Sequence, residues 1–585
     1  MWKLTSRLDG RLKSVRIIVF FLLVLIAAFL SLAGRCFYLQ FFRSGYYSAV
    51  WVNQRQGQII EKPQRGAILD CRGRVLAASN KIQTIFADPA IIKDPGAVSS
   101  KLGPILNMQA GEIYKLITES VNTRYAKLKV GAEAEQCGAA EKIYGIGVDS
   151  DWKRYYPMGP LASNVVGFTS ADNRGLEGIE LKYDKELRGS MGRNIFLADA
   201  FRRPVWPCWQ PAGESSRLAD GVGIILTLDA TIQQFARIEL AKQVESFEAE
   251  SGIAIAADPK TGAIWAMVSI PDFNPNEPQS ADVSNLRDKV ITDQFEPGSM
   301  IKPIIVAIAI ESGTIGRNEH IFCENGNYYG KGFGRINEYQ NHRYGDLSIR
   351  EILIKSSNIG MAKIGQRMGK EKLYNGLKLF GFGKKTGIEL PGEVEGLVRP
   401  IEDWSGYSVT RIPYGYEISV TTMQMLRAFC ILANGGRSVR PYLVKAIVGS
   451  DGEVIKLNRP PPPVGFVISP EAARWIVNDC LVGVVNEKED GGTGWRAKLE
   501  KWQVFGKTGT ANIAKVGEKG YAEKSNLASF IAGAPAEDPA VIVLVSIRKP
   551  NSRLGKGDSG GAVASPVAAR IIEKTLTYLE KQNRL

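Results

Sequence analysis

The most apolar stretch of the chain covers residues 17–34, which carry no charge and are bounded by Arg16 and Arg35. A run of this length is at the short end of what a helix needs to cross a bilayer core. Lysine and arginine are concentrated before the run and sparse after it, which predicts a cytoplasmic N-terminus. The pattern therefore predicts a cytoplasmic tail over residues 1–16 and one membrane helix over residues 17–34. The rest of the chain is then expected outside a bacterial-type inner membrane.

A cleaved signal peptide is the alternative interpretation of the same run. The run is longer than the apolar core of a usual signal peptide, and no clean A-x-A cleavage site ends it. We therefore expect an uncleaved, single-pass anchor.

After the apolar run, the pattern of apolar and polar positions changes twice. Residues 35–64 mix aromatic and polar positions without a clear period and are interpreted as a stalk. Residues 65–79 predict a strand, a turn and a second strand, and two short helices are predicted further on. We expect residues 35–218 to form one mixed α+β module. This module shows no obvious reactive cluster.

From Val222 onward, longer regular patterns appear. An apolar run there predicts a strand, followed by a helix that starts near Asp229. Two apolar arms then flank residues 258–262, whose Asp-Pro-Lys-Thr-Gly sequence predicts a hairpin turn. Residues 469–485 have a helical pattern. We expect residues 219–585 to form the second module.

Composition and charge narrow the classes of function. The chain has 585 residues, 44% of them hydrophobic and 23% charged, which suits two or three folded domains. The net charge of +14 is spread along the chain apart from a cluster before the apolar run, so it predicts no nucleic-acid partner. There are only two histidines and no CxxC pair, which argues against a zinc or other metal site. The seven scattered cysteines assign no disulfide.

A candidate nucleophile lies in the sequence FEPGSMIKP, where Ser299 precedes Lys302 by three residues. In a helix, residues three apart share a face, so hydroxyl and amine can meet. The lysine can act as a base if burial and a second cation lower its pKa from about 10.4. Pro303 is tolerable in a first helical turn. A helix N-terminus also offers free N–H groups to a developing oxyanion. The other Ser-x-x-Lys sequences, at Ser150 and Ser546, lie in patterns that do not begin a helix.

Two further patterns follow in order. Ser356 and Asn358 stand at the start of a helical pattern, and the sequence Lys-Thr-Gly at 507–509 continues an apolar strand-like run. Lys-Thr-Gly also occurs at 260–262, in the predicted hairpin turn, and at 385–387, in a Gly- and Pro-rich loop. Any one of these patterns is common by chance. The ordered set is not.

These residues resemble the Ser-x-x-Lys, Ser-x-Asn and Lys-Thr-Gly motifs of penicillin-binding proteins. The resemblance extends over nearly the whole chain, since RGAILDCRGRVLA and RYYPMGPLASNVVGF are similar to motifs of the N-terminal module of class B members. It implies an elongated α+β pedestal, then a transpeptidase domain with an antiparallel sheet, flanking helices and an all-helical subdomain. Within class B, the sequences GFGKKTGIELPGE and GYEISVT most resemble the division-specific, FtsI-type branch.

The resemblance also implies a site and a reaction without metal or organic cofactor. Ser299 would attack the D-Ala-D-Ala end of a peptidoglycan stem peptide, Lys302 would take its proton, and Ser356 would pass a proton to the departing D-alanine. Lys507 would lie close enough to lower the pKa of Lys302 and to attract the substrate carboxylate. The expected catalytic residues are Ser299, Lys302, Ser356, Asn358 and Lys507, and the expected substrate-binding residues are Thr508, Gly509 and Thr510.

The implied partners are stem peptides, β-lactam antibiotics and a membrane glycan polymerase of the SEDS type (FtsW-like), together with other division proteins. Three alternatives stay open. An elongation-specific transpeptidase is the nearest of them. A β-lactam hydrolase or sensor on the same fold needs a base that activates water, and the sequence reveals none. A structural scaffold with an inactive site is disfavoured by the intact serine and lysines.

Overall fold

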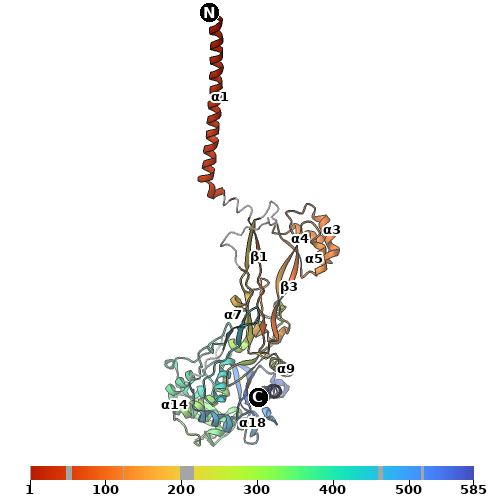
Figure 1. Ribbon diagram of the computed structural model, residues 1–585. Helices are drawn as coiled ribbons and strands as arrows, with labels where there is room; N and C mark the ends of the chain where they lie inside the picture. Colours follow the sequence, from red (N-terminus) through yellow and green to blue (C-terminus); the bar gives the residue numbers. More distant parts are fainter. Residues whose placement is uncertain are drawn as a thin grey trace. The chain divides into compact units, whose positions relative to one another are not determined.

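The computed structural model describes residues 2–47, 50, 56–122, 124–197, 217–458, 465–514 and 520–584. Its first element is the helix α1 (Trp2–Phe41), drawn in red in Figure 1. Within it, Ser14–Phe41 is the one helical segment of the described residues long and apolar enough to cross a membrane. The predicted span of 17–34 lies inside this segment. The helix extends past both of its predicted ends, because the flanking residues continue its backbone hydrogen bonding.

The chain divides into two compact units, which are described separately. The first comprises Met1–Pro63 and Ser190–Ala219. Besides α1 it contains an antiparallel pair of strands, β1 (Gln56–Glu61) and β6 (Gly192–Leu197). Parts of the predicted stalk, residues 35–41 in α1 and 56–61 in β1, therefore have regular secondary structure, although their sequence shows no clear period.

The second unit comprises Gln64–Gly189 and Asp220–Leu585. Its early part contains the predicted strand, turn and strand, as β2 (Ile68–Leu69) and β3 (Val75–Ala87). Asp70 closes the turn, because its carboxylate accepts hydrogen bonds from the backbone N–H groups of Arg72 and Arg74. The remaining elements of this part are β4 (Ala126–Val130), β5 (Ile146–Tyr155), α3 (Pro95–Leu106), α4 (Ala110–Thr118) and α5 (Ala134–Ala140).

One sheet joins strands that are far apart in the sequence. Its order is β17-β16-β7-β2-β3-β4, with β5 also paired to β3. β2 is antiparallel to β3 on one side and parallel to β7 on the other. The later strands are β7 (Gly223–Leu226), β16 (Val444–Val448) and β17 (Val454–Leu457). Strands from both sides of the predicted boundary at 218/219 therefore share one hydrogen-bonded sheet.

The second sheet positions the candidate site. It has five antiparallel strands in the order β18-β19-β20-β8-β9. They are β8 (Ser251–Ala257), β9 (Ile264–Ile270), β18 (Phe505–Ala514), β19 (Tyr521–Ala534) and β20 (Val541–Arg548). The predicted hairpin around 258–262 is the β8–β9 turn. β20 is buried along almost its whole length, because helices cover both of its faces.

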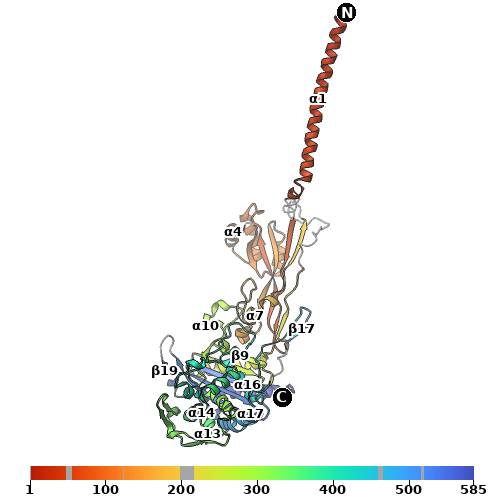
Figure 2. The ribbon, with the colours of Figure 1, turned by 90° about the vertical axis from the view of Figure 1, so that its left-hand side faces the viewer.

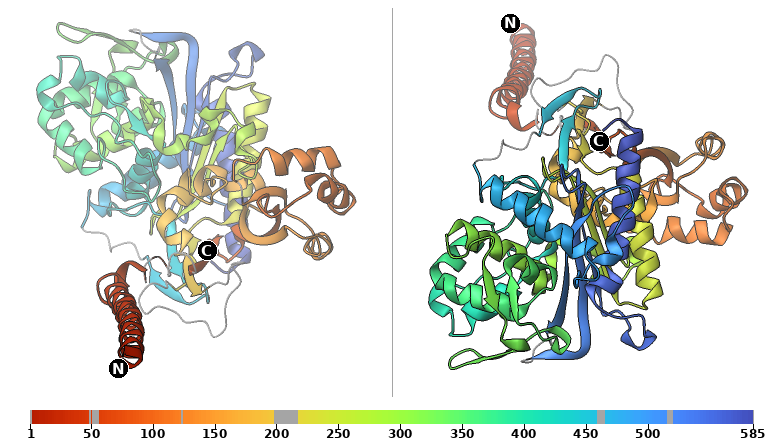
Figure 3. Two further views of the ribbon diagram at one scale, coloured as in Figure 1. Left: turned by 90° about the horizontal axis from the view of Figure 1, so that it is seen from above. Right: turned by 90° about the horizontal axis from the view of Figure 1, so that it is seen from below.

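Helices pack on both faces of this sheet. On one face lie α9 (Ala230–Ser246), which begins after Asp229 as predicted, and the C-terminal α20 (Ser565–Lys581). Figure 3 shows these two helices, in yellow and violet, side by side. On the other face, α16 (Thr422–Ala433) packs against β20, and α12 (Lys302–Glu311) packs against α14 (Asn358–Leu379). Figure 2 labels α14 and α16. The region around α14 also carries short two-stranded ladders, among them β12 (Asn327–Gly330) with β13 (Gly334–Asn337).

A buried ionic network lies between the early strands and the following helices. Glu180 accepts hydrogen bonds from Arg65 Nε and Arg154 Nε, both at 2.6 Å, and all three side chains are almost fully excluded from solvent. Arg65 also pairs with Asp184 at 2.7 Å. The network fixes three separate segments of the chain to one carboxylate.

We predict that Glu180→Ala lowers the free energy of unfolding by about 3–5 kcal/mol, because it leaves two buried guanidinium groups without their shared counter-charge. Urea unfolding of the purified protein in detergent measures this loss. Glu250→Ala is the matched control. Glu250 pairs with Arg548 and Lys549 at the surface, where such pairs contribute about 0–1 kcal/mol. Equal losses in the two variants would contradict the prediction.

Candidate active site

The predicted nucleophile stands directly before a helix. Ser299 lies in the 3₁₀ turn Gly298–Ile301, and α12 begins at Lys302 with Pro303 in its first turn. Gly298 has a φ of 52°, which favours glycine. Gly415 packs so closely that a Cβ there would lie 2.1 Å from the Gly298 carbonyl oxygen. Two glycines therefore shape the turn that presents Ser299.

The competing Ser-x-x-Lys sequences lie in strands, and neither begins a helix, as predicted. Ser150 lies in β5. Ser546 lies in β20, where its buried hydroxyl is 2.9 Å from that of Ser529. Neither serine faces the described cavity, and only Ser299 precedes a helix.

Lys302 meets the second motif at the start of α14. Its Nζ donates hydrogen bonds to the Ser356 carbonyl oxygen at 2.6 Å, to Asn358 Oδ1 at 2.8 Å and to Ser356 Oγ at 3.2 Å. Ser356 has a φ of 58°, a sparsely populated conformation for a residue with a side chain. Among the described residues, the Ser299 hydroxyl makes no hydrogen bond. The amine of Lys302 contacts Ser356 and Asn358 instead.

The third motif supplies a second amine. Lys507, on β18, donates from Nζ to Ser356 Oγ at 2.9 Å. The Ser356 hydroxyl therefore lies between two lysine amines. The other two Lys-Thr-Gly copies are elsewhere: Lys260 pairs with Asp538 in the β8–β9 turn, and Lys385 is exposed in a loop.

Burial dominates the electrostatics of both amines, because neither side chain is exposed. Burial lowers the pKa of Lys302 to about 7, and the negative charge of Glu338 opposes this shift. Burial and the positive charge of Lys302 lower the pKa of Lys507 well below its ordinary value. Burial is therefore the main cause of both lowered pKa values, and a lowering of the Lys302 pKa by Lys507 stays a prediction.

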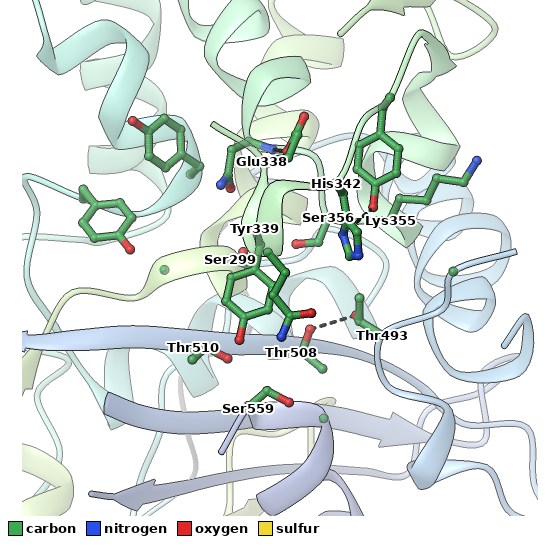
Figure 4. Close-up of a pocket in the computed structure, with 18 residues that line it drawn as sticks. Ser299, Glu338, Tyr339, His342, Lys355, Ser356, Thr493, Thr508, Thr510 and Ser559 are labelled. Atoms are coloured by element: carbon green, nitrogen blue, oxygen red, sulfur yellow. Dashed lines mark hydrogen bonds between the residues drawn. The ribbon is translucent and has the colours of Figure 1, made fainter. Parts of the chain in front are cut away.

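Thr508 and Thr510, two of the three predicted substrate-binding residues, line the same cavity, which has a volume of about 460 Å³. Thr508 Oγ1 is 2.8 Å from Thr493 Oγ1, and Thr510 Oγ1 accepts a hydrogen bond from Gly560 N at 3.1 Å. Gly509 gives close approach to the nucleophile's turn, since a Cβ there would lie 2.8 Å from Met300 Cγ. Figure 4 shows Ser299 between Ser356 on one side and the two threonines on the other.

Several cavity residues were missed by sequence reasoning. One wall is aromatic and partly basic, formed by Tyr339, His342, Tyr344, Lys355, Tyr414 and Tyr416. Glu338 was also missed, although it is buried beside the second motif. These residues have no regular spacing to the motifs, so only the folded chain brings them together. The described residues contain no group of three or more histidine, cysteine, aspartate or glutamate side chains placed to hold a metal ion.

The arrangement is suited to acyl transfer. It combines an unpaired, solvent-reachable hydroxyl with a buried amine whose pKa is near neutrality, which are the requirements for a serine activated by a base. The second hydroxyl, held by both amines, offers a path for a proton.

Comparison with known proteins gives the same picture over most of the chain. Residues 252–573 match the model of the penicillin binding protein transpeptidase domain, and residues 60–207 match that of the penicillin-binding protein dimerisation domain. Stage V sporulation protein D of Bacillus subtilis is 32% identical, over 96% of this chain and 85% of its own. The peptidoglycan D,D-transpeptidase FtsI of Escherichia coli is 30% identical, over 87% of this chain and 82% of its own.

Two solved structures share this fold over most of the chain. Penicillin binding protein 3 of Mycobacterium tuberculosis, complexed with aztreonam, superposes with a TM-score of 0.68 at 25% identity, over 90% of this chain and 97% of that one. A peptidoglycan synthetase from Bifidobacterium adolescentis gives a TM-score of 0.71 at 23% identity, over 90% and 97% of the two chains.

We predict that Lys507→Ala abolishes measurable acylation by penicillin, whereas Lys260→Ala and Lys385→Ala leave it nearly intact. A charged hydrogen bond lost from a water-poor site costs about 1.5–3 kcal/mol, or roughly 10- to 150-fold in rate, and the altered environment of Lys302 adds to this. Exposed lysines usually contribute less than about 0.5 kcal/mol. The second-order acylation rates of the three purified variants test this, with folding checked by thermal melting. A folded Lys260→Ala variant as slow as Lys507→Ala would contradict it.

Proposed function

The chain belongs to the class B penicillin-binding proteins and is a peptidoglycan D,D-transpeptidase, and we propose that Ser299 forms the acyl-enzyme of this reaction. The observation that carries the assignment is the Ser356 hydroxyl, held at 3.2 Å by the Lys302 amine and at 2.9 Å by the Lys507 amine. This hydroxyl belongs to the second motif, and it joins Lys302 of the first motif to Lys507 of the third in one hydrogen-bonded group.

In the acylation step, the neutral amine of Lys302 takes the proton of the Ser299 hydroxyl. The oxygen attacks the carbonyl carbon of the penultimate D-alanine, and backbone N–H groups of Ser299 and Thr510 stabilise the oxyanion. The C–N bond then breaks, and the Ser356 hydroxyl passes a proton to the departing D-alanine. A pKa of about 7 for Lys302 suits this task, because a base works best when its pKa is near the working pH.

Substrate binding falls to residues around this centre. Thr508 and Thr510 would bind the terminal carboxylate, with Lys507 providing positive potential and Gly509 giving room for close approach. Asn358 would hold the substrate amide, while its Oδ1 orients Lys302. In the second step, an amine from a neighbouring stem peptide attacks the ester carbonyl and releases Ser299, which completes the cross-link.

A β-lactam resembles the D-Ala-D-Ala end and should acylate Ser299 with slow release. We predict that a fluorescent penicillin labels the protein covalently at Ser299 and that Ser299→Ala is not labelled, while Ser546→Ala labels normally. Mass spectrometry of the digested adduct identifies the modified residue. An adduct on Ser150 or Ser546 would refute the assignment, and rapid turnover of nitrocefin without stable labelling would favour a hydrolase or sensor.

For the cellular role, we propose septal wall synthesis during division. The support is the similarity of the sequences GFGKKTGIELPGE and GYEISVT to the FtsI-type branch, together with the relative named FtsI. The relative named for sporulation makes that role the second candidate. We also propose that α1 anchors the protein in the inner membrane with its N-terminus in the cytoplasm, and that a SEDS-type glycan polymerase is its membrane partner.

We predict that a fluorescent protein that matures only in the cytoplasm, fused before Met1, is bright and forms a ring at mid-cell. Brightness reports the orientation of α1, and the ring reports the septal role. A dark but full-length fusion would place the N-terminus outside, and signal along the side wall would favour the elongation branch. The proposed partner is tested by co-purification with the SEDS-type polymerase. We expect this co-purification to be lost when α1 is exchanged for an unrelated membrane helix.

A further inference from the structure

Glu338 is a buried carboxylate at the back of the cavity, directly after β13. Its side chain is 4% exposed. Its oxygens accept hydrogen bonds from Ser357 Oγ at 2.5 Å, Asn358 N at 2.6 Å and Ile359 N at 3.3 Å. These donors are the N-terminal groups of α14, which otherwise lack partners, and a negative charge is favourable there.

The same helix start carries the second motif. Ser357 caps α14, since its hydroxyl accepts from Gly360 N at 3.0 Å while donating to Glu338. Asn358 is held from two sides, because its Nδ2 donates to the Asn337 carbonyl oxygen at 3.1 Å and its Oδ1 accepts from Lys302. The position of the motif relative to Lys302 therefore depends on the segment that carries Glu338.

Glu338 is also the acidic group that acts on the buried amine of Lys302. Its charge raises the pKa of Lys302 against the effect of burial. The other titratable groups that face Glu338 are Cys323 and Tyr344, and their pKa values are raised, to about 12 for Tyr344, so both stay neutral near neutral pH. The second amine, Lys507, faces Lys302 from β18.

We propose that Glu338 is a positioning residue for the acyl transfer: its carboxylate holds the start of α14 against Lys302, and its charge keeps the Lys302 amine a strong enough base. The inference rests on the proposed roles of Ser299, Lys302 and Ser356. It goes beyond them because no part of the three motifs includes position 338.

The two functions of the carboxylate have separable consequences. Loss of the helix contacts alone would slow acylation equally at every pH. Loss of the charge removes the group that raises the pKa of Lys302, so the pKa falls. The Lys302 amine then stays neutral at lower pH, so the acid limb of the pH–rate profile moves to lower pH. Because the amine is also a weaker base, the plateau rate falls.

The test is the second-order rate of acylation by fluorescent penicillin between pH 5 and 9, measured on the full-length protein with the adduct mapped to Ser299. For Glu338→Gln we expect a plateau reduced about tenfold or more and an acid limb shifted down by roughly one pH unit. For Glu338→Asp, which keeps the charge but shortens the side chain, we expect a reduced plateau with the limb in place. Glu351→Gln is the matched control, because the Glu351 carboxylate also accepts hydrogen bonds at a helix start, from Ser348 N and Oγ before α13 (Ile349–Ile354). The acid limb of this variant should not move.

A histidine ordinarily changes charge within this range, and His342 lines the cavity. The profiles are therefore repeated with His342→Gln in both backgrounds, where the shift should persist. An acid limb that does not shift in Glu338→Gln would overturn the proposal, because Glu338 would then act only as a cap of α14. If Glu338→Gln does not fold, a wild-type plateau in Glu338→Asp would overturn it instead. Failure of the wild-type protein to label at Ser299 would count against the proposed function, which is a different result.

Discussion

Two buried lysine amines that meet at one hydroxyl are the central constraint of this structure. Ser356 Oγ accepts from Lys302 and from Lys507, and neither lysine is exposed to solvent. Burial makes a positive charge on either amine unfavourable, and the charge of Lys302 adds to this at Lys507, so both pKa values are lowered. The site therefore has, in Lys302, an amine that can take up and give back a proton near neutral pH.

The fold satisfies this constraint by bringing together three separate segments. The central apolar helix α12 carries Lys302 in its first turn, β18 at the edge of the five-stranded sheet carries Lys507, and α14 presents Ser356 from its start. Each segment is held by its own contacts: glycines at the nucleophile's turn, the ladder between β18 and β19, and the Glu338 carboxylate at α14. The packing of these segments leaves neither lysine side chain exposed to solvent.

The elements that could be predicted from the sequence are those that a local pattern of residues determines. The hairpin at 258–262, the helix after Asp229, the strand at Lys507 and the helix start near Ser299 all follow from turn chemistry and periodicity over a few residues. It also brought the three motifs together through their order and the family resemblance. Glu338 and the aromatic wall have no local signal, because their roles arise from contacts between distant segments. The parallel pairing of β2 with β7 was missed for the same reason, since pairing between distant strands leaves no mark on either strand alone.

That pairing sets an order of events in the life of the chain. β2 and β3 lie early in the sequence. The next strands of their sheet are β7 and then β16, which lies more than halfway along the chain. If the chain is exported N-terminus first, the edge of β2 has no partner until β7 has emerged, and β7 in turn waits for β16. Contacts of such long sequence separation form slowly, so the first strands pass through a period in which one edge is open to other chains. Assembly of the sheet is thus completed only after most of the catalytic region has been made.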